Sequence, residues 1–167
     1  YLYKTKTEPL IAAESENEII DIGLINREYQ RISGVSDCVL LDGDSGLMSP
    51  IATGYQNIDM IKLLNLPVLL VLTPSEESIN DTLLSITALQ EKGLTVRGVI
   101  INNITEDTPK SLITSISRVI EEYSNVKILG LVPHLEQGFS PEDLITGILN
   151  GIDIESVFNV KIEKLEL

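Results

Sequence analysis

Apolar residues along the chain alternate between short unbroken runs and longer segments in which they recur every three or four positions. The runs have the length and composition of strands that are buried on both faces of a parallel sheet. They are residues 38–41, 67–72, 96–101 and 126–132. The segments between them have the spacing of helices that pack on such a sheet. This alternation predicts an α/β fold with a three-layer, mostly parallel sheet, helices on both faces, and a single domain over residues 1–167.

Residues that favour helix ends mark the boundaries of the helical segments. The predicted helices cover residues 16–31, the segment that Asn57 can cap, 78–92, 109–123 and 141–149. Ser140 is the expected N-cap of the last helix, and Pro141 takes its first position. Residues 1–13, with scattered charge and Pro9, predict an irregular lead-in. Residues 152–167 are expected to hold a short helix and a terminal strand or coil.

Composition and charge exclude several classes of partner. Of the 167 residues, 43% are hydrophobic and 22% are charged, as in a globular protein. The net charge of −13, from 25 acidic and 12 basic residues, argues against nucleic-acid and anionic membrane partners. The single cysteine, Cys38, excludes an internal disulfide and fits a reducing, cytoplasmic compartment. Because Cys38 lies in an apolar run, we expect it to be buried in the core.

A carboxylate follows the first apolar run and precedes a turn of small residues. Asp42 comes directly after residues 38–41, and Gly43 and Gly46 lie in the turn that follows. In open α/β sheets the ligand lies beyond the carboxyl ends of the strands, so Asp42 is well placed to hold Mg²⁺ or a bound water of a nucleotide. The alternative is a strand that runs into a surface turn, where Asp and Gly are common.

The later strands also end in residues that suit a nucleotide base. Asn102 has the paired donor and acceptor that match an adenine edge, and the Pro133-His134-Leu135 turn offers an apolar wall. Each has an ordinary alternative. Asparagine at the end of a strand is common in turns, and proline after a strand commonly ends that strand. His134, next to Pro133, is typical of a solvated loop residue.

Other sequence features argue against some catalytic sites. The helix that begins near Ser78 has the geometry of an anion site, but Glu76 and Glu77 already place negative charge there. A Ser-His hydrolase motif and metal-binding His/Cys spacing are both missing. No Gly-Lys pair occurs, so the sequence has no G-x-x-x-x-G-K-[ST] phosphate loop. Because the chain opens with Tyr1, we expect an internal fragment of a longer protein.

Several segments, taken in order, match the motifs of one family. Residues 41–50 (LDGDSGLMSP) resemble V-E-G-A-G-G-x-x-x-P, residues 66–72 resemble L-P-V-I-L-V, and residues 77–84 (ESINDTLL) resemble G-x-I-N-H-x-L-L. Gly93, Leu94, Gly98 and Asn102 match G-L-x-x-x-G-x-x-x-N, residues 132–135 resemble I-P-x-L, and residues 8–13 resemble S-P-H-x-A-A. This ordered series is similar to that of dethiobiotin synthetase and its relatives among the P-loop NTPases.

The resemblance implies a P-loop NTPase-like fold, truncated at the N-terminus, and an ATP- and Mg²⁺-dependent cyclo-ligase of biotin biosynthesis. In that reaction the carbamate of a diamine carboxylate, formed with CO₂, attacks the γ-phosphate of ATP, and ring closure gives a cyclic urea. The resemblance implies a homodimer that binds a small carboxylate substrate. It assigns residues to three kinds of site. These are Asp42 for Mg²⁺; Asn102, Pro133, Leu135, Gly43 and Gly46 for the nucleotide; and Ser78, Ser49 and Pro50 for the substrate.

Departures from the family pattern leave three hypotheses open. The phosphate-binding motif is missing, so ATP and Mg²⁺ binding is expected only if the missing N-terminal portion is supplied. Glu77 stands where the family has Gly, Glu8 and Leu10 replace Ser and His, and Asp44 and Ser45 replace Ala and Gly. The alternatives to the cyclo-ligase are a non-catalytic binding or regulatory domain of related fold and an amide-forming ligase that acts on another carboxylate.

Overall fold

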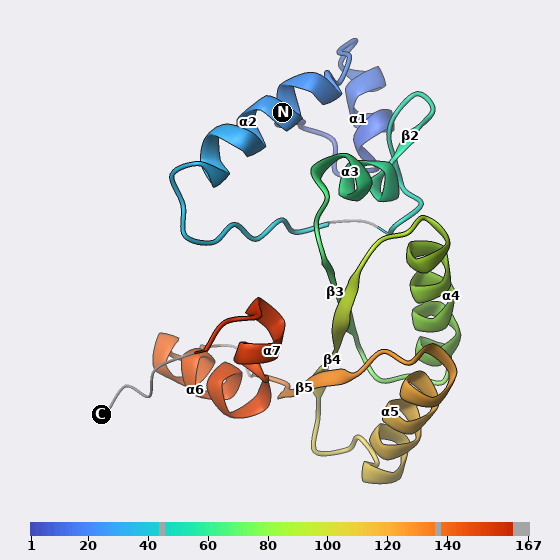
Figure 1. Cartoon of the computed structure of the whole chain (residues 1–167), viewed down its shortest axis with the longest axis vertical. Coiled ribbons are helices and arrows are strands. Elements are labelled where there is room, and N and C mark those ends of the chain that lie inside the picture. Colours follow the sequence, from blue (N-terminus) through green and yellow to red (C-terminus); the bar gives the residue numbers. More distant parts are fainter. Residues whose placement is uncertain (44–45, 136–137, 162–167) are drawn as a thin grey trace. The chain divides into compact units, whose positions relative to one another are not determined.

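The computed structural model describes residues 1–43, 46–135 and 138–161. The chain divides into two compact units, Tyr1–Leu66 and Pro67–Leu167, and each is described by itself (Figure 1). The prediction of a single domain stays a prediction.

The second unit is built on a parallel sheet. Its strands are β3 (Val68–Leu72), β4 (Val96–Ile104) and β5 (Ile128–Pro133), in the order β3-β4-β5. Its helices are α4 (Ser78–Glu91), α5 (Lys110–Ser124), α6 (Pro141–Gly151) and α7 (Ile154–Phe158). Helices α4 and α5 lie on one side of the sheet, and α6 and α7 lie on the other (Figure 1). The predicted α/β fold, with a parallel sheet between helices, is confirmed.

The core of this unit lies between the sheet and helices α4 and α5. Ile86 of α4, Ile101 of β4 and Ile116 of α5 are fully buried and pack in one cluster. Of these, Ile116 lies on the apolar face that the helical spacing predicted for residues 109–123. The three predicted strands of this unit are confirmed to within three residues at each end.

Two glycines allow the chain beyond α6 to approach the edge of the sheet. Ile152 forms an antiparallel bridge with Gly130 of β5, and the Asp153 amide donates to the Leu129 carbonyl at 2.7 Å. A Cβ atom added at Gly151 would lie 2.5 Å from the Leu131 carbonyl oxygen. Only a residue without a side chain fits such a contact, so Gly151 sets how closely the end of α6 packs on β5.

The first unit combines three helices and a small hairpin. Its elements are α1 (Pro9–Ser15), α2 (Ile22–Ser33), β1 (Pro50–Ala52), β2 (Tyr55–Gln56) and α3 (Asn57–Leu64). Strands β1 and β2 are antiparallel. Ala13, Ile20 and Ile51 are buried together and form its core.

The predicted irregular lead-in over residues 1–13 is wrong for its second half. Residues from Pro9 onward form α1, with Pro9 in the first turn and Ala12 and Ala13 buried. Proline is compatible with the first turn of a helix because its missing amide hydrogen has no intrahelical partner there. The next predicted helix, over 16–31, begins later, at Ile22.

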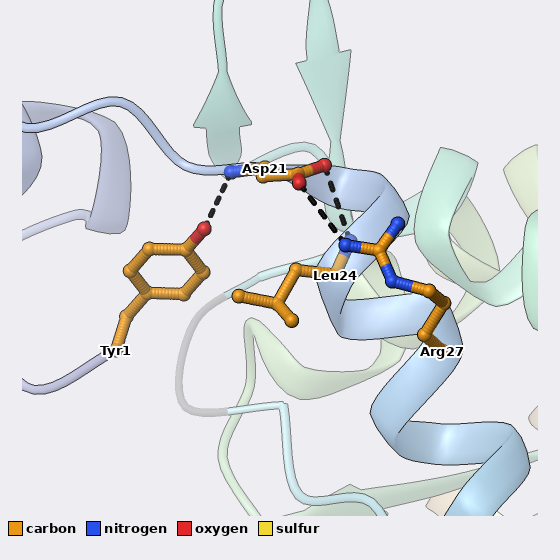
Figure 2. A network of polar contacts seen from close by, with 4 residues as sticks. All are labelled: Tyr1, Asp21, Leu24 and Arg27. Carbon is orange, nitrogen blue, oxygen red and sulfur yellow. Dashed lines mark hydrogen bonds and ion pairs between the residues drawn. The ribbon is translucent and has the colours of Figure 1, made fainter.

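Asp21 fixes the start of α2 and connects it to the beginning of the chain (Figure 2). Its Oδ1 atom accepts from the Leu24 amide at 3.1 Å, as expected of an N-cap. Its own amide donates to the Tyr1 hydroxyl at 2.7 Å, and Arg27 donates to its Oδ2 atom at 3.4 Å. The contacts with Leu24 and Arg27 fix the first turns of α2, and the contact with Tyr1 connects the helix start to the beginning of the chain.

The predicted strand over residues 38–41 is wrong. These residues have no strand assignment, and the side chains of Leu40 and Leu41 are 77% and 55% exposed. Cys38 is exposed as well, so its predicted burial is also wrong. A strand needs a neighbouring strand for its backbone hydrogen bonds, and no described residue pairs with this segment. An apolar run alone does not supply that partner.

Candidate functional site

The second unit has a hollow of about 550 Å³ where β5 ends and α6 begins. Its size is in the range of small-molecule sites. The lining residues come from the end of β5, the following loop and the first two turns of α6. They are Pro133, His134, Leu135, Gly138, Phe139, Asp143, Thr146 and Gly147. The hollow therefore lies at the carboxyl end of a parallel strand, where α/β sheets bind their ligands.

The first turn of α6 places a fixed carboxylate in this lining. The Ser140 hydroxyl accepts from the Asp143 amide at 3.1 Å, as predicted for an N-cap. In return, the Asp143 Oδ2 atom accepts from the Ser140 amide at 3.0 Å and from its hydroxyl at 2.9 Å. These hydrogen bonds from Ser140 lower the pKa of Asp143 below its ordinary value because they favour the ionised form. The hollow thus has a negative charge at the helix N-terminus.

His134 connects the ends of β4 and β5. Its amide donates to the Ile104 carbonyl at 2.8 Å, and its ring Nδ1 lies 2.6 Å from the Asn103 Oδ1 atom. Because an amide oxygen only accepts, Nδ1 is the donor in this pair. The ring is exposed, but it is held by Asn103. The predicted loop histidine is therefore part of the junction between two strands.

The predicted base-binding residues lie on these two strand ends. Pro133 and Leu135 line the same hollow. Asn102 is exposed near the end of β4, next to Asn103, and is not among the lining residues. Their predicted contact with a base is not tested by these positions and stays a prediction.

A hydrogen-bonded turn between Ser75 and Ser78 forms the start of α4. The Ser78 hydroxyl donates to the Ser75 carbonyl at 2.8 Å, and the Ser78 amide donates to the Ser75 hydroxyl at 3.1 Å. Ser78 is buried, whereas Glu76 and Glu77 are exposed. Ser78 therefore shapes the turn before α4, and its predicted contact with a substrate carboxylate stays a prediction.

The predicted metal and glycine-loop residues lie in the first unit. Asp42 and Gly43 are exposed in an irregular segment, and residues 44 and 45 lie outside the described part of the chain. Gly46 is hydrogen-bonded to the first residue of α3, because the Asn57 side-chain amide donates to the Gly46 carbonyl at 2.9 Å.

Ser49 and Pro50 belong to the same loop. The Ser49 amide donates to the Gly46 carbonyl and the Ser49 carbonyl accepts from the Asn57 amide, both at 3.0 Å, and Pro50 begins β1. The loop that the family motif covers is thus anchored to the start of α3. The roles of Ser49 and Pro50 in substrate binding stay predictions.

Asp42 was the predicted Mg²⁺ ligand. Across residues 1–43, 46–135 and 138–161, no group of three or more His, Cys, Asp or Glu side chains is arranged to hold a metal ion. Mg²⁺ in nucleotide sites commonly takes one or two carboxylates and completes its shell with phosphates and water. A single exposed carboxylate such as Asp42 fits that mode of binding, in which the protein supplies only part of the coordination shell.

Sequence reasoning missed the side of the hollow that α6 provides. Asp143 was recognised only as part of a helix start, and Phe139 was not considered. The cap motif Ser140-Pro141-Glu142-Asp143 located the helix correctly. Its place beside β5 depends on how α6 packs, which the apolar pattern does not specify.

The fold and the hollow define a class, the α/β domains that bind a ligand at the carboxyl ends of parallel strands. A family model described as an AAA domain matches residues 1–141. Curated relatives include the ATP-dependent dethiobiotin synthetase BioD of Akkermansia muciniphila, 35% identical over 78% of this chain and 61% of its own length. Those of Methanococcus vannielii and Bacillus licheniformis are 34% and 27% identical over 77% and 95% of this chain, and over 61% and 67% of their own lengths. The chain belongs to the AAA-domain family of P-loop NTPases that resemble dethiobiotin synthetase.

The match has a limited extent. The chain spans about three fifths of the length of the first two relatives, 61% in each case. The resemblance that the ordered motifs indicated is confirmed at the level of the family. In the described part of the chain, no helix has the length and apolar character needed to span a membrane.

Proposed function

We propose that this chain forms part of a dethiobiotin synthetase-like cyclo-ligase and contributes the base-binding side of its ATP site. The reaction joins CO₂ to a diamine carboxylate and closes a cyclic urea at the expense of ATP. Two observations support the proposal: the relatives named as ATP-dependent dethiobiotin synthetases, and the hollow at the end of β5. The hollow carries the argument, because Pro133 and Leu135 of the family's I-P-x-L segment both line it.

The residues of the second unit would bind the base and exclude water from it. Pro133 and Leu135 offer apolar surface, and the Asn102 amide offers one donor and one acceptor to an adenine edge. The link between His134 and Asn103 holds the two strand ends in place, so these contacts need little rearrangement on binding.

The resemblance assigns residues of the first unit to the metal, the nucleotide and the substrate. The Asp42 carboxylate would hold Mg²⁺, Gly43 and Gly46 would contact the nucleotide, and Ser49 and Pro50 would contact the substrate. Bound Mg²⁺ supplies neutralisation of the phosphate charge during transfer. The diamine carbamate would attack the γ-phosphorus and displace ADP, and the second amine would then attack the carbonyl carbon of the resulting carbamoyl phosphate, close the ring and release phosphate. The chain's part in this is to position the reactants.

A second candidate is a non-catalytic binding or regulatory domain of the same family. Glu76 and Glu77 are exposed at the start of α4, where the proposed enzyme would accept the substrate carboxylate. Their negative charge disfavours an anionic substrate at that helix end. This observation favours a domain that binds a nucleotide or partner without the ligase reaction.

The remaining parts of the proposal concern assembly and location. We propose a cytoplasmic homodimer that binds a small carboxylate, without a nucleic-acid or membrane partner. The net charge of −13 supports the lack of anionic partners, and the single cysteine supports a reducing compartment.

The test uses the intact protein, titrated calorimetrically with ATP and Mg²⁺ and then assayed for phosphate release with a diamine carboxylate and bicarbonate. Binding with substrate-dependent phosphate release supports the ligase. Binding without release supports the non-catalytic domain, and no heat of binding overturns the ligase. Asp42→Asn should weaken Mg-ATP binding about tenfold, as expected for loss of one charged contact. Its melting temperature should not change, because Asp42 is exposed. Asp37→Asn, an exposed carboxylate before the same segment, is the control.

A further inference from the structure

We propose that Asn57 is a positioning residue of the ligase, which fixes the turn over residues 46–49 in the conformation that its ligands require. In this inference Asn57 touches no ligand and acts only through the turn. The inference rests on the proposed function, which assigns Gly46 to the nucleotide and Ser49 and Pro50 to the substrate. None of the matched family motifs includes Asn57.

Asn57, the first residue of α3, contacts both ends of this turn. Its side-chain amide donates to the Gly46 carbonyl at 2.9 Å, and its backbone amide donates to the Ser49 carbonyl at 3.0 Å. The Ser49 amide also donates to the Gly46 carbonyl, at 3.0 Å. These three hydrogen bonds connect the first and last residues of the turn to each other and to one residue of α3. Loss of the Asn57 side-chain contact would therefore change the conformation of the turn at Gly46.

The neighbours of Asn57 bind the two middle carbonyls of the turn. The Gln56 Nε2 atom donates to the Met48 carbonyl at 2.8 Å, and the Ile58 amide donates to the Leu47 carbonyl at 2.9 Å. Four successive carbonyls of the turn thus accept from three successive residues at the start of α3. Ile58 is only 1% exposed, so close packing fixes the backbone of this segment. The turn has one conformation because a buried segment sets the direction of each of its carbonyls.

The turn leads directly into a proline that the proposed function assigns to the substrate. Pro50 has no amide hydrogen, so it cannot donate a backbone hydrogen bond of its own. The peptide group that joins it to the turn carries the Ser49 carbonyl, which accepts from the Asn57 amide. The position of the Pro50 ring therefore depends on the contact between Ser49 and Asn57.

The side-chain contact of Asn57 with the turn can be removed without weakening α3. Gln56, not Asn57, is the N-cap of this helix, and the Gln56 amide donates to the Asp59 carboxylate at 3.1 Å. Aspartate is favourable in the first turn of a helix because its charge complements the helix dipole. An ionised carboxylate only accepts hydrogen bonds, so Asn57→Asp removes the donor to the Gly46 carbonyl and preserves the helix.

The test measures the steady-state kinetics of the intact protein with ATP, Mg²⁺, bicarbonate and a diamine carboxylate. Asn57→Asp should raise the KM for the diamine carboxylate about tenfold, as expected for loss of one hydrogen bond that orients the binding residues. A purely structural role would lower the fraction of active protein, and hence kcat, at an unchanged KM. Asn57→Gln keeps an amide donor, so its KM should lie nearer to the wild-type value. Asn26→Asp, the same exchange at a half-buried position of α2, is the control and should keep the wild-type KM.

Amide hydrogen exchange tests the contact without any ligand. In Asn57→Asp, the Ser49 amide should exchange about tenfold faster than in the wild type, because the Gly46 carbonyl that accepts from it is no longer fixed. The amides of α2 should exchange at wild-type rates. Unchanged exchange at Ser49 would overturn the inference, because the side chain of Asn57 would then have no effect on the turn.

Failure of the inference is distinguishable from failure of the proposed function. If the wild-type protein releases phosphate and Asn57→Asp keeps the wild-type KM, the inference fails while the ligase function stands. Equal KM values for Asn57→Asp and Asn57→Gln also contradict the inference, because the amide donor then has no role. If the wild-type protein releases no phosphate, the ligase function and the inference fail together.

Discussion

The ring of His134 donates to the side-chain oxygen of Asn103 across 2.6 Å, and this contact joins the ends of β4 and β5. Asn103 has a left-handed backbone, with φ of 60°. Asparagine adopts this conformation more readily than most residues, and its side chain also provides the acceptor. Asn103 therefore provides both the left-handed backbone conformation and the hydrogen bond that links the ends of β4 and β5.

Two substitutions at Asn103 separate these contributions. Asn103→Gly keeps the backbone conformation accessible and removes the hydrogen bond, so it should lower the free energy of unfolding by about 1 kcal/mol. Asn103→Ala removes the same bond and adds left-handed strain, for a further loss of about 1 kcal/mol. Urea unfolding measures both. If the alanine variant is as stable as the glycine variant, strain at this position is negligible.

The N-cap hydrogen bond of Asp21 should contribute more to the stability of the first unit than the ion pair between Asp21 and Arg27 does. Asp21→Ala removes the N-cap of α2 and should lower the free energy of unfolding by about 1 kcal/mol. Arg27→Gln removes only an exposed ion pair, with side chains 66% and 58% exposed, and should cost under about 0.5 kcal/mol. Chemical unfolding of both variants measures the difference. Equal losses would contradict the capping role.

The cap of α6 should make stability depend on pH in the acid range. The pKa of Asp143 is lowered in the folded state by hydrogen bonds from Ser140, from an ordinary value of 3.8. A lowered folded-state pKa stabilises the fold above the ordinary value, and this stabilisation is lost as the pH falls through the folded-state pKa. The stability difference between wild type and Asp143→Asn should therefore narrow as the pH falls below 3.8.

Urea unfolding at pH 7 and at several values below pH 4 measures this difference. Asp153 provides a matched second case, because hydrogen bonds from Ser156 lower its pKa at the start of α7. Asp153→Asn should show the same narrowing. A difference that stays constant with pH in both variants would rule out the linkage.

Burial should separate two apolar positions in neighbouring strands. Ile101 of β4 is fully buried, so Ile101→Ala should lower the free energy of unfolding by about 2–5 kcal/mol. Val71 of β3 is 60% exposed, and Val71→Ala should cost under about 1 kcal/mol, because little packing is lost. Thermal and urea unfolding measure both. Similar losses at the two positions would mean that Val71 is covered in solution.

The sequence predicted the second unit well because its elements report their own packing. The unbroken apolar run located β3, and α5 has a clear apolar face, with Ile116 and Ile120 buried. The predicted burial of β3 on both faces is wrong, because only Leu72 of this strand is buried and Val71 is 60% exposed. Such patterns depend on local spacing and on burial by neighbours that are close in the chain. The family motifs added the order of the elements and the predicted base-binding residues.

The first unit was predicted less well, for physical reasons. The run at residues 38–41 has the composition of a strand, but strand formation depends on a partner that composition does not reveal. Pro9 was taken as a sign of irregular structure, although it stands at the start of α1. At the candidate site, Asp143 and Phe139 were missed because their role depends on the packing of α6, and only Ser140 and Pro141 marked that helix.

The close approach at Gly151 has a practical consequence for engineering this protein. A side chain at that position would collide with the Leu131 carbonyl, and relief of the collision would shift the helix that carries Asp143, Thr146 and Gly147. Libraries intended to alter ligand preference can therefore randomise the lining of α6 while Gly130 and Gly151 stay fixed. Variation at those two glycines would deform the lining of the hollow instead of changing its chemistry.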